Sequence, residues 1–251
     1  MPTRTVLTLA LLSLTAALGL ACATGEPALD GASPGIYDRR PPSQGGTGKI
    51  YMGREISLTM TWHGIPWLER EDREERELPD RVVEAMALAP GDVVADIGAG
   101  SGYFTFRIAR RVPEGRVLAV DVQDEMLTAL GRRMDEEGLD NVDLILGAID
   151  DPKLPPAEVD AALMVDAYHE FSHPYEMMTR LVEAIRPGGR VILVEYRGED
   201  RDSHIHPLHR MTEAQVRREM AAVGLDWVKT LDFLPDQHML IFTKPAGEAP
   251  G

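Results

Sequence analysis

The sequence has a single cysteine, Cys22, in 251 residues. One thiol cannot form an intramolecular disulfide, and after position 22 no thiolate is left to bind a metal cluster or to act as a nucleophile. The stability of a folded domain must therefore come from its core.

Basic residues are also scarce. The chain has 26 Lys and Arg against 41 Asp and Glu, which gives a formal net charge of −15. This charge disfavours nucleic acid or an anionic lipid surface as a partner, whereas a small-molecule or cationic substrate is easier to accommodate. The composition is otherwise that of a globular protein, with 44% hydrophobic residues. The length favours one large domain over two small ones.

The N-terminus carries the longest apolar run, residues 6–20, between Arg4 and Ala21-Cys22-Ala23. This layout is typical of a secretory signal peptide over residues 1–23 and predicts an exported, periplasmic or membrane-anchored protein. Either cleavage follows Ala23, or a lipid on Cys22 tethers the chain to a membrane, as in bacterial lipoproteins. A run of about 15 residues is short for an uncleaved spanning helix, which needs about 20. A cytoplasmic protein with a signal-like N-terminus is the alternative.

Residues 24–48 contain six glycines and four prolines. We therefore expect a flexible linker over residues 24–52, then one domain over residues 53–245 and a tail over residues 246–251. Within the domain, apolar runs alternate with amphipathic segments, which predicts a parallel sheet covered by helices on both faces. The predicted strands are 93–96, 116–121, 142–147, 159–166, 190–196, 226–233 and 238–243. The predicted helices are 103–112, 124–137, 174–186 and one that Thr212 caps, ending near Val223.

The most informative motif follows the first of these strands. It reads Asp96-Ile-Gly98-Ala-Gly100-Ser-Gly102. Such glycines permit positive φ and let backbone N–H groups approach a ligand at a helix N-terminus. A dinucleotide fingerprint needs its third glycine at position 103, which is a tyrosine. The next strand ends in Asp121, where a carboxylate can accept both hydroxyls of a ribose.

This arrangement resembles the class I S-adenosylmethionine-dependent methyltransferases. Their first motif is acid-x-Gly-x-Gly-x-Gly, and their second strand ends in the ribose-binding acid. The resemblance extends to residues 160–170 and 186–195, similar to the family's fourth motif and fifth strand, and covers roughly residues 80–245. It implies a Rossmann-like, doubly wound, mainly parallel seven-stranded sheet with an antiparallel C-terminal strand. It also implies S-adenosylmethionine as cofactor and transfer of its methyl group to an acceptor.

Position by position, the resemblance implies a set of cofactor-binding residues. They are Asp96, Gly98, Ala99, Gly100, Gly102, Asp121, Val122, Ile149, Asp150 and Asp166. The alternative for the glycines alone is a tight strand-to-helix turn without a ligand.

Two residues near the end of the fourth strand are candidates for catalysis. His169 is suited to act as a general base near neutral pH, and Tyr168 to border the methyl acceptor. The alternative is that His169 only caps a loop. At this position, amino-directed nucleic-acid methyltransferases carry the motif Asn/Asp-Pro-Pro-aromatic. This chain has Asp166-Ala-Tyr-His169 instead, which departs from that motif. We therefore predict a small-molecule acceptor, and no oligomeric state is indicated.

The segment before the first strand, residues 53–88, is expected to form a helical lid. Trp62, His63 and Trp67 are candidates for its inner wall, unless the tryptophans simply pack on the sheet. Further along, His204, His206 and His209 suggest a metal site, but Pro207 breaks helical spacing and no cysteine assists, so we predict no metal. The alternative to an enzyme is an exported protein that binds the nucleoside cofactor without transferring a methyl group.

Overall fold

The computed structural model describes residues 35–247. The predicted signal peptide, with Cys22 and Ala23, and all but the start of the predicted tail lie outside the described residues. Among the residues described, no helix is both long and apolar enough to span a membrane.

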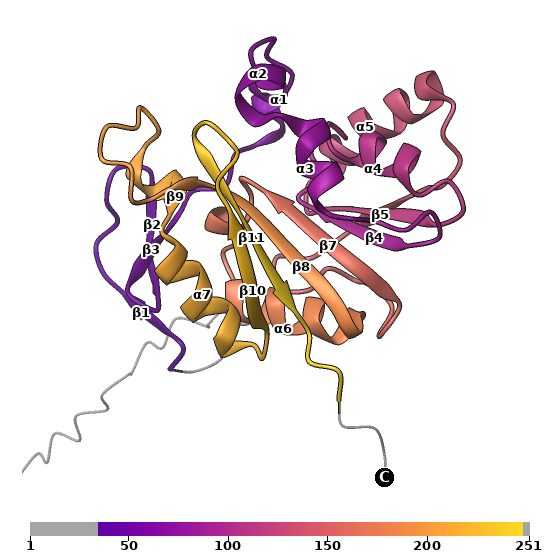
Figure 1. Ribbon diagram of the computed structural model, residues 1–251. Helices are drawn as coiled ribbons and strands as arrows, with labels where there is room; N and C mark the ends of the chain where they lie inside the picture. The colour runs from indigo at the N-terminus through magenta and orange to yellow at the C-terminus, as the bar shows by residue number, and fades with distance from the viewer. Residues whose placement is uncertain (1–34, 248–251) are drawn as a thin grey trace, which may run out of the picture. The chain divides into compact units, whose positions relative to one another are not determined.

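The main sheet has seven strands in the order β10-β11-β8-β7-β4-β5-β6, and a short eighth strand, β9, pairs with β8 (Figure 1). Their bounds are β4 Val93–Ile97, β5 Arg116–Asp121, β6 Val142–Leu146, β7 Val159–Val165, β8 Ile185–Arg197, β9 Arg210–Met211, β10 Asp226–Leu231 and β11 Gln237–Thr243. From β8 to β6 all neighbours are parallel, whereas β11 is antiparallel to both β8 and β10. The predicted α/β fold, mainly parallel with an antiparallel C-terminal strand, is confirmed.

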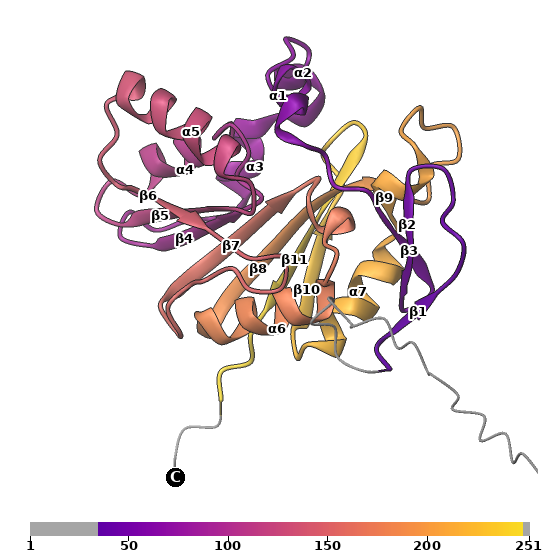
Figure 2. The ribbon, with the colours of Figure 1, turned by 180° about the vertical axis from the view of Figure 1, so that it is seen from behind.

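Helices cover both faces of this sheet, as Figures 1 and 2 show together. On one face lie α3 (Pro79–Ala85), α4 (Thr105–Arg111) and α5 (Asp124–Glu137), and on the other α6 (Pro174–Ala184) and α7 (Glu213–Ala222). Successive strand residues point to opposite faces, so Val94 joins the first core and Ala95 the second. This two-sided burial explains why the strands read as continuous apolar runs.

Local signals placed several elements correctly. The strand 116–121 and the helix 124–137 have the predicted bounds. The hydroxyl of Thr212 accepts a hydrogen bond from the N–H of Gln215 at 3.1 Å and caps α7. Met211 and Val216, on either side of the cap, are both buried.

The predicted linker is wrong for its described part. Residues 35–52 contribute most of a three-stranded antiparallel sheet made of β1 (Tyr37–Arg39), β2 (Gly46–Tyr51) and β3 (Arg54–Ser57). Its buried Glu55 carboxylate accepts hydrogen bonds from the N–H groups of Ser43 and Gly48, at 3.0 and 2.9 Å. The glycines that suggested disorder instead serve a tight turn at Gly45, φ +77°, and an irregularity of β2 at Gly48, φ +72°.

The segment predicted as a helical lid therefore begins as a strand. After β3 come the short helices η1 (Trp62–Gly64), α1 (Ile65–Leu68) and α2 (Arg73–Glu77). Two more 3-10 turns, η2 (Tyr168–Glu170) and η3 (Pro207–His209), follow β7 and precede β9.

Candidate active site

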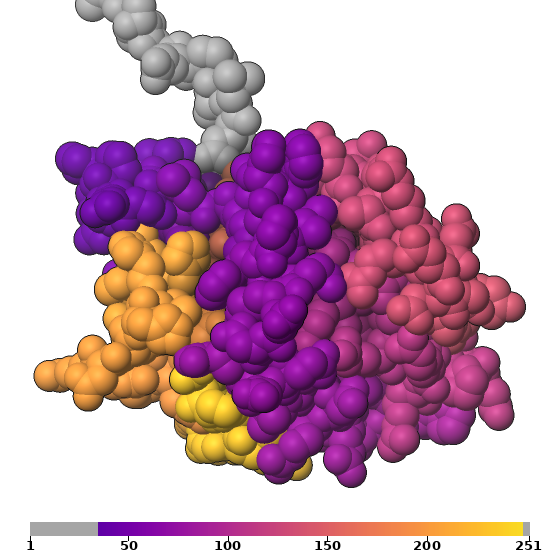
Figure 3. Space-filling model, turned by 90° about the horizontal axis from the view of Figure 1, so that it is seen from above, coloured from indigo at the N-terminus to yellow at the C-terminus, as the bar shows by residue number. Residues whose placement is uncertain are grey.

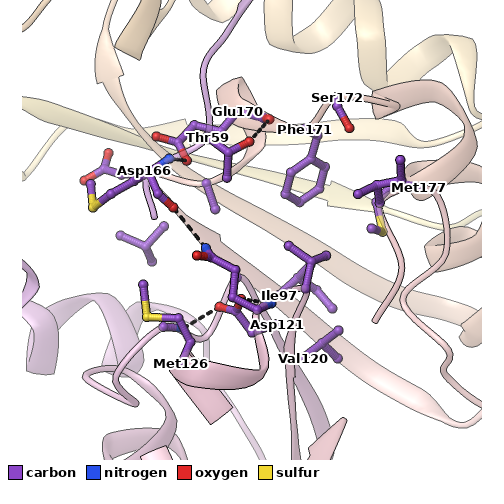
Figure 4. Close-up of a pocket in the computed structure, with 18 of the residues that line it drawn as sticks. Thr59, Ile97, Val120, Asp121, Met126, Asp166, Glu170, Phe171, Ser172 and Met177 are labelled. Carbon is purple, nitrogen blue, oxygen red and sulfur yellow. Dashed lines mark hydrogen bonds between the residues drawn. The ribbon is translucent and has the colours of Figure 1, made fainter. Parts of the chain in front are cut away.

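A cavity lies at the carboxyl ends of β4, β5 and β7, where the strand order reverses. Open α/β sheets bind their ligands at such a switch point. Figure 4 shows the side chains of Asp121 and Asp166 on its wall. The predicted cofactor residues that line it are Gly98, Gly100, Asp121, Val122, Ile149 and Asp166.

The glycine loop forms one side of the cavity with its bare backbone. Gly98 and Gly100 have φ of +75° and +54°. A Cβ on Gly98 would lie 2.9 Å from the Cβ of Ala167, and one on Gly100 would lie 3.1 Å from Leu68 Cδ1. The left-handed backbone favours glycine at both positions, and at Gly98 a Cβ would also lie too close to Ala167.

Asp121 is held by backbone amides. The N–H of Gly100 donates to its Oδ2 at 3.0 Å, and the N–H of Gln123 donates to Oδ1 at 2.9 Å. Burial raises the pKa of Asp121, while these amides favour the ionised form. Each carboxylate oxygen has a second lone pair, so the group can still accept hydrogen bonds from a ligand hydroxyl.

Asp166 faces the same cavity from the end of β7 in a left-handed conformation, φ +48°. Its Oδ2 accepts a hydrogen bond from the side-chain amide of Gln237 at 2.7 Å. Among the described residues, nothing pairs with its buried Oδ1. Burial, followed by the nearby carboxylates of Glu77 and Glu195, raises the pKa of Asp166 well above its ordinary value. This buried oxygen in the cavity wall is therefore available to a ligand group.

Residues 59–62 form a strap beside this cavity, and Thr59 and Met60 line it. The N–H of Met60 donates to Glu170 Oε2 at 2.8 Å, and the carbonyl of Met60 accepts from the Gln123 side chain at 2.9 Å. The N–H of Trp62 donates to Gln123 Oε1 at 2.9 Å. Seen from above in Figure 3, the chain that continues from the strap through α1 and α2 lies across the molecule between the orange and the pink segments. The predicted lid thus covers the site as an extended strap followed by short helices.

A second cavity adjoins the first. The two share Met60, Leu68, Val165, Asp166 and Glu170 as a common wall. On its far side the second cavity is lined by Trp67, Arg70, Arg73, Glu77, Tyr196 and residues of the 204–209 loop. Two adjoining cavities with shared lining residues can hold a donor and an acceptor next to each other, which direct transfer requires.

His169 lines the second cavity and is fully positioned by its neighbours. Its Nδ1 lies 2.7 Å from Glu195 Oε2, and its Nε2 lies 3.0 Å from Nδ1 of His209. Burial lowers the pKa of His169, but the Glu195 carboxylate outweighs burial and the pKa is raised. Burial, followed by the charge of His169, lowers the pKa of His209 to about 4. The pair is therefore able to share one proton next to the cavity.

Several predicted site residues do not line either cavity: Asp96, Ala99, Gly102, Asp150 and Tyr168. Asp96 is buried below the loop and accepts a hydrogen bond from the hydroxyl of Thr105 at 2.6 Å. Tyr168 is fully buried, and its hydroxyl donates to Glu219 at 2.7 Å, so the prediction that it borders the acceptor is wrong. Gly102 leaves room for packing, since a Cβ there would lie 2.7 Å from the ring of Phe106.

Of the three predicted wall residues of the lid, only Trp67 lines a cavity. Trp62 stacks on His63 with ring centroids 3.9 Å apart, outside both cavities. Trp62 and Trp67 are 41% and 48% exposed, so neither packs on the sheet as a core residue.

Gln123, Glu170 and Gln237 are site residues that the sequence did not reveal. Gln123 lies two residues after the ribose-type acid Asp121, so its position close to that acid is a signal in the sequence. Gln237 reaches Asp166 from the antiparallel strand, across 71 residues, and no spacing rule indicates that contact.

Comparisons with known proteins agree with this geometry. Residues 94–189 match the sequence family described as a methyltransferase domain. A solved S-adenosylmethionine-dependent methyltransferase from Aquifex aeolicus aligns with a TM-score of 0.70 at 24% identity, over 74% of this chain and 100% of that one.

The sequence matches to curated relatives cover a smaller share of this chain. Arsenite methyltransferase of Halobacterium salinarum is 29% identical over 43% of this chain and 28% of its own length. The ubiquinone/menaquinone biosynthesis C-methyltransferase of Ectopseudomonas mendocina is 26% identical over 45% of both chains. The chain thus spans less than half the length of these two relatives.

The fold and the matched methyltransferase domain imply S-adenosylmethionine as cofactor, and the residues of the first cavity fit it. The bare glycine backbone leaves space that a Cβ would fill, and Asp121 presents a held carboxylate at the end of β5. The unpaired Oδ1 of Asp166 offers a further polar contact in the same cavity.

Proposed function

We propose that this protein transfers a methyl group from S-adenosylmethionine to a small-molecule acceptor. The observation that carries the proposal is the common wall between the two cavities, with Asp166 and Glu170 facing both. The cofactor occupies the cavity at the glycine loop, and the acceptor occupies the one at His169.

The protein's own contribution is mainly positioning. The cofactor supplies an electrophilic methyl group on a sulfonium. Asp121 accepts the ribose hydroxyls, and Val122 and Ile149 provide apolar contacts on the open side, where they are 39% and 53% exposed. The strap keeps water from the reacting atoms and fixes their separation, which accounts for much of the rate enhancement in such displacements.

The features of the second cavity support an acceptor that carries a polar or ionisable group. Buried charged side chains, Arg73 and Glu77, and the histidines of the loop line it. The net charge of −15 argues against nucleic acid as the acceptor. Arsenite, the acceptor named for one relative, is disfavoured by the thiol count, because Cys22 is the only cysteine.

The test is formation of S-adenosylhomocysteine. The full chain is incubated with S-adenosylmethionine and pools of small phenols, thiols, amines and carboxylic acids, and the product is quantified by mass spectrometry. Acceptor-dependent turnover supports the proposal. Tight cofactor binding with no turnover on any pool would instead support a cofactor-binding protein without transferase activity.

We also propose that the protein is exported, on the strength of the signal-like residues 1–23. Cell fractionation tests this proposal, and Cys22→Ser separates its two routes. Loss of membrane association in that variant supports lipidation, whereas an unchanged soluble periplasmic pool supports cleavage. Recovery of the wild-type chain, uncleaved, in the cytoplasm would contradict export.

A further inference from the structure

Three side chains with metal-ligating atoms converge at the edge of the second cavity: His169, Glu170 and His209. Nε2 of His169 lies 3.0 Å from Nδ1 of His209 and 3.8 Å from Oε1 of Glu170. Nδ1 of His209 lies 3.7 Å from the same Oε1. They come from two loops that are about 40 residues apart, after β7 and before β9.

The geometry points to a divalent transition-metal site, and we propose that these three residues bind zinc. A point equidistant from three atoms at these separations lies about 2 Å from each, which is the length of Zn–N and Zn–O bonds of about 2.0–2.2 Å. Two imidazoles and one carboxylate are also the donor set of catalytic zinc sites that keep a position open for water or substrate.

The atoms that would not bind the ion are already held by the protein. Nδ1 of His169 pairs with Glu195 Oε2 at 2.7 Å, and the Glu195 side chain is fully buried. Oε2 of Glu170 accepts the N–H of Met60 at 2.8 Å, which leaves Oε1 for the metal. A carboxylate behind a ligating histidine fixes its tautomer and orientation and is a recurrent support of zinc sites.

The exposed fractions of the three side chains suit an ion that also contacts a substrate. The side chains of His169, Glu170 and His209 are 3%, 11% and 36% exposed, so the cluster has one open side. All three line the proposed acceptor cavity, and Glu170 is part of the wall shared with the cofactor cavity.

The role of the ion rests on the proposed function, although zinc binding itself does not. An acceptor hydroxyl or thiol bound to the ion loses its proton to solvent more readily, and its oxygen or sulfur then attacks the methyl carbon as the carbon–sulfonium bond breaks. His169 is then a metal ligand, and the prediction that it acts as a general base is replaced.

The test measures zinc binding to the full chain after removal of metals with a chelator. Competition with a chromophoric chelator should give one equivalent of tightly bound Zn²⁺, and Co²⁺ should give the visible bands of a four- or five-coordinate ion. His209→Ala should weaken zinc binding by at least about 100-fold, and Glu195→Gln by about 10- to 100-fold. His204→Ala is the matched control, because it removes a neighbouring histidine of the same loop and should leave zinc affinity unchanged.

Two results would overturn the site: no stoichiometric zinc binding by the wild-type chain, or equal losses in His204→Ala and His209→Ala. S-adenosylmethionine binding is measured on the same samples. Cofactor binding without zinc binding removes the metal site and leaves the proposed function, whereas zinc binding without cofactor binding does the reverse.

Discussion

The side chain of Gln123 is hydrogen-bonded to the backbone of Met60, 63 residues earlier in the chain, with Nε2 and the carbonyl oxygen 2.9 Å apart. The same glutamine accepts the N–H of Trp62 and lies two residues after Asp121, to which its own N–H donates at 2.9 Å. One residue thus connects the strap to the strand end that carries the proposed ribose contact.

Gln123→Ala should therefore loosen the strap without unfolding the protein. Loss of both side-chain hydrogen bonds, worth about 1 kcal/mol each, should raise the dissociation rate of S-adenosylhomocysteine by about tenfold or more. Stopped-flow tryptophan fluorescence measures this rate. Gln215→Ala, a change outside both cavities, is the control. Equal rates in wild type and Gln123→Ala would show that the strap does not retain the cofactor.

Gly98→Ala tests the close approach of the glycine loop. The control is Gly138→Ala, because Gly138 also has positive φ, +63°, but a Cβ there meets nothing within 4 Å. Both variants should lose about 1–2 kcal/mol of stability from the left-handed backbone, and Gly98→Ala should lose more, because its Cβ would lie 2.9 Å from that of Ala167. Only Gly98→Ala should also lose cofactor binding, which calorimetry measures. Equal binding by both variants would mean that the loop does not contact the cofactor.

The raised pKa of the buried Asp96 carboxyl should make the stability of the protein depend on pH. Burial raises its pKa to about 6 in the folded protein. The unfolded carboxyl titrates near 4, so between about pH 4 and 6 the folded state binds more protons, and Asp96 lowers the free energy of unfolding as pH rises. At pH 7, Asp96→Asn should be more stable than wild type by up to about 3 kcal/mol, and the gain should vanish near pH 4.

Urea denaturation at several pH values measures this difference. The exposed Asp226→Asn controls for the loss of one charge from an acidic chain. A gain for Asp96→Asn that is independent of pH would contradict the assignment.

Arg54 supports the His169 loop from the small sheet. Its guanidinium forms two hydrogen bonds with the buried Glu219, at 2.7 and 3.0 Å, and donates to the carbonyl of His169 at 3.1 Å. Arg54→Met leaves the Glu219 charge buried and unpaired, which should cost about 3–5 kcal/mol of unfolding free energy. Arg54→Met/Glu219→Gln should recover part of this loss. Thermal and urea denaturation test both, and no recovery in the double variant would show that the ion pair is not the cause.

The sequence predicted the parts of this protein that depend on local pattern. The runs 116–121 and 124–137, the Thr212 cap and the acids at the ends of β4, β5 and β7 are all encoded by adjacent residues. The strands β1 to β3 were missed because a glycine- and proline-rich segment looks the same whether it forms turns or a linker. The side-chain partners of Tyr168 and Asp96 depend on which way each side chain points, which the motif does not specify.

Long-range contacts account for the remaining differences. His209 was considered with its sequence neighbours His204 and His206, whereas in the structure it faces His169, 40 residues away. Gln237 and Glu195 likewise approach the site from other strands. Such groupings depend on the register of the sheet and on the path of its loops, so they become visible only in three dimensions.

Cofactor binding in the first cavity is tested by isothermal titration of the full chain with S-adenosylmethionine and S-adenosylhomocysteine, beside Asp121→Ala and the exposed Asp140→Ala. We expect saturable binding by wild type and Asp140→Ala, and affinity at least about tenfold weaker in Asp121→Ala, since a hydrogen bond to a charged group is worth about 1.5–3 kcal/mol. Absence of binding by the folded wild-type chain, or binding unaffected by Asp121→Ala, would contradict the assignment of this cavity to the cofactor.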